Sequence, residues 1–118
     1  MTSLELAKEI AKILDSKKGV EITAISVKDL TIISDYFVIA SGTSSTQVKA
    51  LADAVEMKLK EQGVAPNKIE GHRSNTWILM DYGTVIVHVF LNETRDFYQL
   101  ERLWADGEKV DIGLKDTD

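Results

Sequence analysis

The sequence predicts a single α/β domain built on a mixed sheet that is apolar on both faces. The chain has 118 residues, of which 44% are hydrophobic and 28% charged, and this composition is ordinary for one globular domain. Two long segments repeat apolar residues at helical spacing. Two further segments, Thr76–Met80 and Thr84–Leu91, read as strands that are apolar at nearly consecutive positions. Such strands need cover on both faces, because a strand with one wet face alternates apolar and polar residues.

The first predicted element is an amphipathic helix over residues 3–16. Thr2 and Glu5 have the spacing of a capping box. Apolar residues after them share one helical face, as expected of a helix that packs on a sheet.

Two strands and a second helix follow. Val20–Val27 contains several β-branched residues, and Asp35–Ser41 is apolar on both faces, which predicts a central strand. Ser44 and Gln47 form a second possible capping box, from which the helix runs to about Gln62. A strand after this helix completes a βαβ crossover.

The C-terminal half contains the hairpin, a final helix and a tail. The element order is α-β-β-α-(β)-β-β-α, where the bracketed strand precedes the hairpin. Residues 92–94 are predicted as a turn, Arg95–Ala105 as a short helix, and residues 106–118 as an acidic, flexible tail outside a single domain of residues 1–105.

The hairpin raises the question of what covers its two faces. Trp77 and Leu79 point to one side, whereas Ile78 and Met80 point to the other. Three helices can cover one face fully and the other only in part, so we expect an exposed apolar area near Trp77. The pattern leaves open which face is the exposed one.

Charge and composition limit the kinds of partner. The net charge is −5; residues 1–69 hold nine acidic and nine basic residues, and residues 70–118 hold ten acidic and five basic. Lysine and arginine are not clustered, so nucleic acid is not expected as the main contact and a basic protein is favoured. The chain lacks cysteine, a signal-peptide pattern and an apolar run long enough for a bilayer. We therefore expect a cytoplasmic protein without membrane contact.

Motifs that could carry chemistry have weak support. The segment Gly42–Ser45 between a strand and a helix could hold a phosphate, so a nucleotide-binding or nucleotidyltransferase-like enzyme is the alternative interpretation. That enzyme needs paired carboxylates on a strand, but the chain's Asp-x-Asp is Asp116 and Asp118, near its end. His72 and His88 have no metal-ligand spacing. We expect no catalytic residue, metal or cofactor.

Several longer motifs resemble those of the ribosomal silencing factor family, also called Iojap-like proteins. The motifs cover most of residues 3–105 and comprise Asp35–Ser45, Glu70–Gly71, Trp77–Gly83, Val85–Phe90 and Glu93–Trp104. One departure is Thr46-Gln47, where many relatives have Arg-His, so any role of those basic residues is in doubt here.

The resemblance implies a protein that regulates translation and is not an enzyme. Members bind a protein of the large ribosomal subunit at the inter-subunit face, block joining of the small subunit and repress translation when nutrients are short. The implied fold is a nucleotidyltransferase-like core without catalytic carboxylates, and the free chain is implied to form homodimers.

The hairpin and the last helix supply the candidate contact residues. Aromatic residues are common anchors of protein interfaces, and acidic residues suit a basic partner. The predicted contact set for the ribosomal protein is Trp77, Leu79, Asp81, Tyr82, His88, Glu93, Tyr98 and Glu101.

Overall fold

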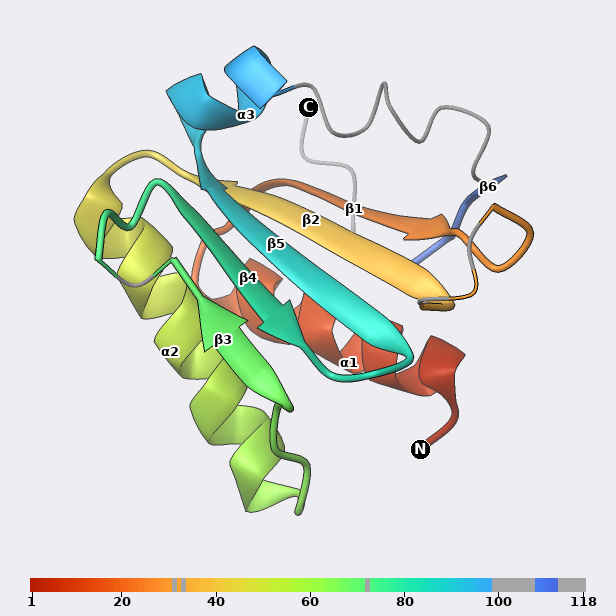
Figure 1. The fold of residues 1–118 in the computed structure, drawn as a ribbon. Coiled ribbons are helices and arrows are strands. Elements are labelled where there is room, and N and C mark those ends of the chain that lie inside the picture. Colours follow the sequence, from red (N-terminus) through yellow and green to blue (C-terminus); the bar gives the residue numbers. More distant parts are fainter. Residues whose placement is uncertain (31, 33, 72, 99–107, 113–118) are drawn as a thin grey trace.

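The chain folds into a mixed α/β domain with three helices and one six-stranded sheet among its described residues (Figure 1). The computed structural model describes residues 1–30, 32, 34–71, 73–98 and 108–112, and the backbone alone for residues 96–98. The elements are α1 (Ser3–Ser16), β1 (Val20–Ser26), β2 (Tyr36–Gly42), α2 (Ser45–Glu61), β3 (Lys68–Glu70), β4 (Trp77–Asp81), β5 (Val85–Leu91), α3 (Asn92–Tyr98) and β6 (Glu108–Lys109).

The sheet is mixed, and its two central strands are parallel. The strand order is β3-β4-β5-β2-β1-β6. β2 pairs with β5 in parallel, and the other neighbours pair antiparallel. All seven residues of β2 are buried, which confirms the central strand that its two apolar faces predict. The predicted fold class and the bracketed strand, here β3, are therefore correct.

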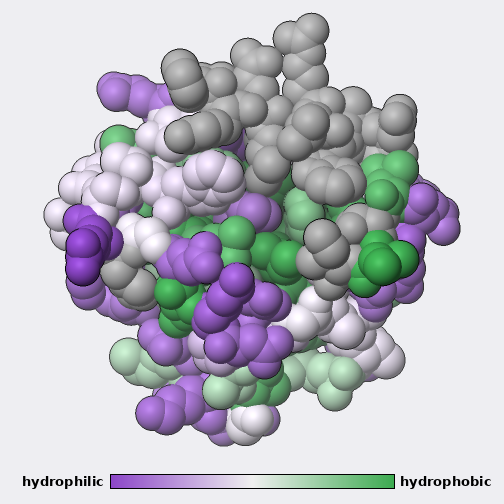
Figure 2. All heavy atoms as spheres, viewed as in Figure 1, coloured by the Kyte–Doolittle hydropathy of each residue, from purple (hydrophilic) through white to green (hydrophobic). Residues whose placement is uncertain are grey.

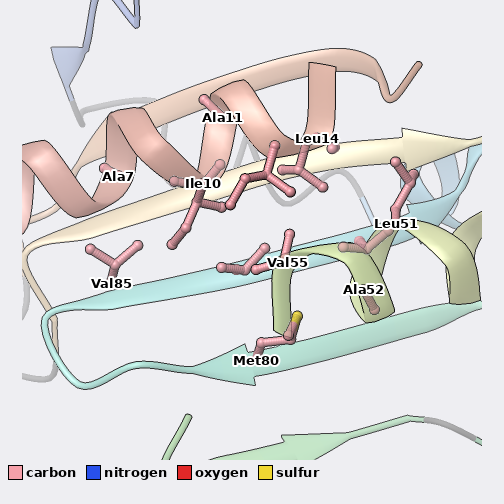
Figure 3. Close-up of a cluster of buried hydrophobic side chains, with 14 of the residues drawn as sticks. Ala7, Ile10, Ala11, Leu14, Leu51, Ala52, Val55, Met80 and Val85 are labelled. Atoms are coloured by element: carbon pink, nitrogen blue, oxygen red, sulfur yellow. The ribbon is translucent and has the colours of Figure 1, made fainter. Parts of the chain in front are cut away.

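Helices α1 and α2 cover one face of the sheet and enclose the main core (Figures 1 and 3). Ile10 and Leu14 of α1 meet Leu51 and Val55 of α2 there, and Met80 of β4 points into the same cluster (Figure 3). All five are fully buried. The face with Ile78 and Met80 is thus the helix-covered face, which answers the question that the sequence pattern leaves open.

The helix starts follow the predicted capping residues with one difference. Thr2 and Glu5 form the complete capping box, with bonds of 3.0 and 3.1 Å. Ser44 accepts a bond from the Gln47 amide at 3.1 Å. The Gln47 side chain, however, accepts from the Thr43 amide at 2.7 Å, so the second box closes one residue earlier than predicted.

The last helix begins earlier than the sequence suggests. Residues 92–94 were expected to form a turn, but α3 starts at Asn92, directly after β5. Asparagine and threonine suit helix starts as well as turns, and Glu93 in the first turn complements the helix dipole. The turn prediction is wrong for this reason. The predicted continuation to Ala105 lies outside the described residues.

Part of the segment predicted as a flexible tail pairs with the sheet. Glu108 and Lys109 form β6 against Ser26 and Ile25 of β1, and Val110 donates a backbone bond to Ala24 at 2.9 Å. The buried side chain of Ile112 joins the main core. The sequence pattern did not predict this contact, because Val110 and Ile112 are single apolar residues among charged ones. In the part of the chain that the structure describes, none of the helices has the length and apolarity needed to cross a membrane.

Candidate functional site

The side of the sheet away from α1 and α2 carries a second apolar cluster, here called the Trp77 face (Figure 2). Figure 2 shows hydrophobic side chains near the middle of this side, bordered by hydrophilic ones. The cluster comprises Ile25, Val27, Phe37, Ile39, Ile86 and Phe90, with Trp77 and Leu79 packed against it. The first six are buried, whereas Trp77 and Leu79 are only partly buried. The part of this cluster that a partner can contact therefore lies mainly on β4.

Trp77 is held in one orientation by its neighbours on β5. Its indole Nε1 donates a hydrogen bond to Nδ1 of His88 at 3.1 Å. Its ring stacks on Phe90 with a centroid separation of 4.9 Å. Trp77, His88 and Phe90 thus form an aromatic group, and Phe37 extends it, with its ring centroid 5.0 Å from that of His88. A ring fixed by a bond on one edge and stacking on one face loses little entropy when a partner covers its remaining surface.

His88 is a neutral, buried member of this group. Burial lowers the pKa of its imidazole to about 4, because the cationic form loses its hydration inside the apolar cluster. Since Nδ1 accepts the bond from Trp77, the proton of the neutral ring is on Nε2. The buried Nε2 has no hydrogen-bond partner among the residues that the structure describes. His88 thus acts as a support beneath Trp77, and does not reach the surface itself.

A shallow hollow of about 260 Å³ lies beside Trp77. It is lined by Glu70, Gly71, Trp77 and Leu79. Gly71 has a φ of +96°, and a Cβ added there would lie 2.0 Å from the Trp77 carbonyl oxygen, so only glycine allows this close approach. Glu70 places a carboxylate at the rim, 3.3 Å from the Nζ of Lys68. The hollow combines an apolar floor with an acidic rim, which suits a side chain with an apolar stem and a basic end.

The turn of the hairpin divides its residues between the two faces. Asp81 lies on the Trp77 face by strand alternation, and its Oδ1 accepts a bond from the Gly83 amide at 2.8 Å. Tyr82, in contrast, packs against the core under the helices. Burial, with a smaller contribution from Glu56, raises the pKa of the Tyr82 phenol to about 12. Tyr82 therefore lies apart from Trp77, although the two were predicted to share a contact surface.

Comparison with known proteins identifies the family. The family model described as "Ribosomal silencing factor during starvation" matches residues 1–118. The chain belongs to the ribosomal silencing factor family.

Individual relatives agree with the family assignment. The ribosomal silencing factor of Chromobacterium violaceum is 43% identical over 110 residues, covering 93% of this chain and 89% of the relative. That of Halalkalibacterium halodurans is 36% identical over 112 residues, covering 95% and 96%. A crystal structure of a Chromobacterium violaceum protein superposes with a TM-score of 0.87 at 40% identity, covering 98% of this chain and 95% of that one. The nucleotidyltransferase-like character of the fold stays a prediction.

Within this silencing-factor domain, the structure brings together part of the predicted contact set. Trp77, Leu79 and Asp81 share the Trp77 face, with His88 buried beneath. Glu93 is exposed at the start of α3. Tyr98 is the last described residue of α3, but its side chain lies outside the described part of the chain, as does all of Glu101.

Sequence reasoning missed two structural residues of this silencing-factor domain. Gly71 shapes the hollow, and its only signal was its place beside Glu70 in a family-like motif. The sequence pattern predicts Arg95 as the first residue of a helix and says nothing of its side chain, which is buried against the sheet. A lone arginine two residues after an acidic one carries no pattern that tells a buried side chain from an exposed one.

The segment Gly42–Ser45, the alternative phosphate site, makes close contacts with the start of α2. A Cβ at Gly42 would lie 2.9 Å from a Val48 methyl, so this glycine permits close packing of α2 on the end of β2. Gln47 Oε1 accepts bonds from the amide and the hydroxyl of Thr43, at 2.7 and 2.9 Å. The Thr43 amide and hydroxyl and the Gln47 amide are thus bonded within this segment. Among the described residues, no group of three His, Asp or Glu side chains is arranged to hold a metal ion.

Proposed function

We propose that the chain silences ribosomes by binding a basic protein of the large subunit at the inter-subunit face. Bound there, it blocks the small subunit sterically, so translation falls when nutrients are limiting. The family assignment supports the silencing role. The observation that carries the docking mode is the pair of partly exposed apolar side chains, Trp77 and Leu79, on the face that α1 and α2 leave uncovered.

The charges around this pair favour a basic partner. Glu70 forms the rim of the hollow, Asp81 ends β4 on the same face, and Glu93 stands exposed at the start of α3. Lys68 offsets one of these charges through its pair with Glu70. The excess of acidic residues in residues 70–118 agrees with this local balance. Complementary charge speeds association and fixes the register of docking more than it adds affinity.

Steric exclusion accounts for the activity without chemistry by this chain. The Trp77 face offers an apolar anchor and an acidic border, and in the Gly42–Ser45 loop the Gln47 side chain accepts both hydrogen bonds of Thr43. We propose accordingly that the protein is not an enzyme and needs no cofactor. It acts in the cytoplasm. When the protein is free of the ribosome, a second copy of the chain can bind the Trp77 face in place of the ribosomal protein.

Two linked measurements test this proposal. The protein is sedimented with purified large subunits, and then small subunits are added to the preformed complex. Binding to large subunits and a reduced yield of joined ribosomes are expected. Joining that proceeds at the normal rate on saturated large subunits would contradict steric exclusion. A protein that stays in the supernatant would contradict the docking itself. Binding and turnover of nucleotide with magnesium would instead support the enzymatic alternative.

A further inference from the structure

Arg95 is a buried arginine at the junction of α3, β1 and β2. Its side chain is 4% exposed. Nη1 donates to the Glu21 carbonyl at 2.7 Å and to the Ser41 hydroxyl at 2.9 Å, with the Val20 carbonyl further away at 3.5 Å. These partners lie between 54 and 75 residues earlier in the chain. One side chain thus connects the last described helix to two strands of the sheet.

The arginine lies where β1 departs from regular pairing. Val20 pairs with Ser41 and Thr23 with Ile39, so two residues of β1 oppose the single residue between those partners. Glu21, in this bulge, has a φ of +51°. A bulged residue loses its ladder hydrogen bonds, so its partly buried carbonyl is left for another donor. The Arg95 guanidinium supplies that donor.

The placement of α3 depends on such a contact. The described part of α3, Asn92–Tyr98, has seven residues, and helices in proteins gain most of their stability from tertiary packing. An apolar side chain could fill the space under α3 without the desolvation cost of a buried guanidinium. The arginine adds direction, because its bonds to fixed acceptors define both the distance and the rotation of α3 on the sheet.

The Ser41 contact also connects Arg95 to the Trp77 face. Ser41 pairs in register with Phe90, so both side chains point to that face. Phe90 in turn stacks on Trp77. Arg95 therefore bonds to a residue beside Phe90, at one end of the aromatic group of Trp77, His88 and Phe90. Glu93 stands exposed two residues before Arg95.

We propose that Arg95 is a positioning residue, which fixes α3 and thereby the place of Glu93 relative to the Trp77 face. The partner then meets an acidic group and an aromatic anchor at a set separation. This role rests on the proposed function, since it presumes that the Trp77 face and Glu93 contact one partner. Its structural part, the holding of α3, can be measured in the free protein.

The first test is hydrogen exchange of the free protein with Arg95→Met and Arg95→Lys. Arg95→Met is expected to raise exchange in residues 92–98 by at least roughly tenfold, with little change in α1. Arg95→Lys keeps the positive charge but loses the planar guanidinium with its fixed set of donors, so an intermediate rise in exchange is expected. The control is Arg73→Met, because Arg73 is exposed. If Arg95→Met does not fold, Ser41→Ala removes one acceptor and is expected to loosen the same residues.

The second test is a double-mutant cycle read out by binding to large subunits. Glu93→Ala is expected to weaken binding about fivefold in the native background and not at all beside Arg95→Met, since α3 no longer presents Glu93. Trp77→Ala is expected to keep its full effect in both backgrounds. A merely structural Arg95 would leave the Glu93 effect unchanged.

The outcomes separate the two proposals. Unchanged exchange in residues 92–98 of the Arg95 variants, or of Ser41→Ala, overturns the positioning role whatever the ribosome measurement shows. Additive effects of Arg95→Met and Glu93→Ala overturn it as well. Failure of the unaltered protein to bind large subunits overturns the proposed function and the docking role with it, while the exchange result still decides whether Arg95 holds α3.

Discussion

The indole Nε1 of Trp77 donates a hydrogen bond to Nδ1 of His88 at 3.1 Å, from β4 to the adjacent β5. The bond satisfies the polar atom of Trp77 inside the apolar cluster, so the residue offers a partner its hydrophobic ring surface. It also gives a buried histidine a defined tautomer. The two residues form one unit, in which the inner residue sets the orientation of the outer one.

Substitution of His88 should therefore act on Trp77. His88→Leu leaves the indole N–H without its acceptor, which should lower the free energy of unfolding by roughly 1–3 kcal/mol. His88→Asn keeps a carbonyl oxygen near the Nδ1 position and should cost less. Denaturant unfolding measures both, and fluorescence in a Trp104→Phe background reports Trp77 alone. A His88→Leu protein with native stability and native Trp77 emission would show that the bond orients nothing.

The stability of the protein should depend on pH through His88. Its folded pKa is about 4, while an unfolded histidine has a pKa near 6.5. Between these values the unfolded state binds more protons, so the free energy of unfolding should fall as the pH drops from about 6.5 to 4, by roughly 3 kcal/mol at most. His88→Asn should remove this slope, and His72, the other histidine of the chain, is present in both proteins. Equal slopes for the two proteins would show that a group other than His88 causes the pH dependence.

Asp81 combines a structural bond with a charge, and two variants separate them. Asp81→Ala removes the bond to the Gly83 amide and should destabilise the protein by about 1 kcal/mol. Asp81→Asn keeps an accepting oxygen and loses only the charge. If the charge meets a basic partner, Asp81→Asn should fold normally and bind large subunits more weakly. Normal binding by Asp81→Asn would assign the residue to the turn alone.

Glu93 should contribute to binding through its charge. Glu93→Lys is expected to reduce affinity for large subunits about tenfold at low salt and less at high salt, because exposed charges are screened. Glu61→Lys is a matched control, since Glu61 is also exposed but belongs to α2, under the opposite face of the sheet. Equal losses for the two reversals would mean that net charge, and not the position of Glu93, governs association.

Much of the fold could be predicted because the hydrophobic pattern is strong. The stretch around Val38 has no polar face, which requires a central strand, and Thr2 with Glu5 marks a helix start that the structure reproduces. The helix-covered face could not be predicted, because Ile78 and Leu79 are equally apolar and alternation does not tell which side the helices choose. Register and packing, which pair Trp77 with Phe90, decide it.

The candidate site could be predicted only in part, for the same reason. Trp77 and Leu79 follow from alternation, but Tyr82 falls after the strand ends, where alternation no longer applies. Arg95 gave no signal, since two of its acceptors are backbone carbonyls at a bulge more than seventy residues away in the chain, and a third is the Ser41 hydroxyl. Contacts to backbone carbonyls leave no trace in the identity of the accepting residue.

The central claim is that Trp77 anchors the protein to the large subunit. The most direct measurement is the affinity of Trp77→Ala for purified large subunits, beside Met57→Ala as control. Met57 is 60% exposed on α2, so both variants remove an accessible apolar side chain, from opposite sides of the sheet. With both variants shown to fold, Trp77→Ala should lose at least roughly tenfold in affinity, and Met57→Ala should bind like the unaltered protein. Native affinity for Trp77→Ala would contradict the account.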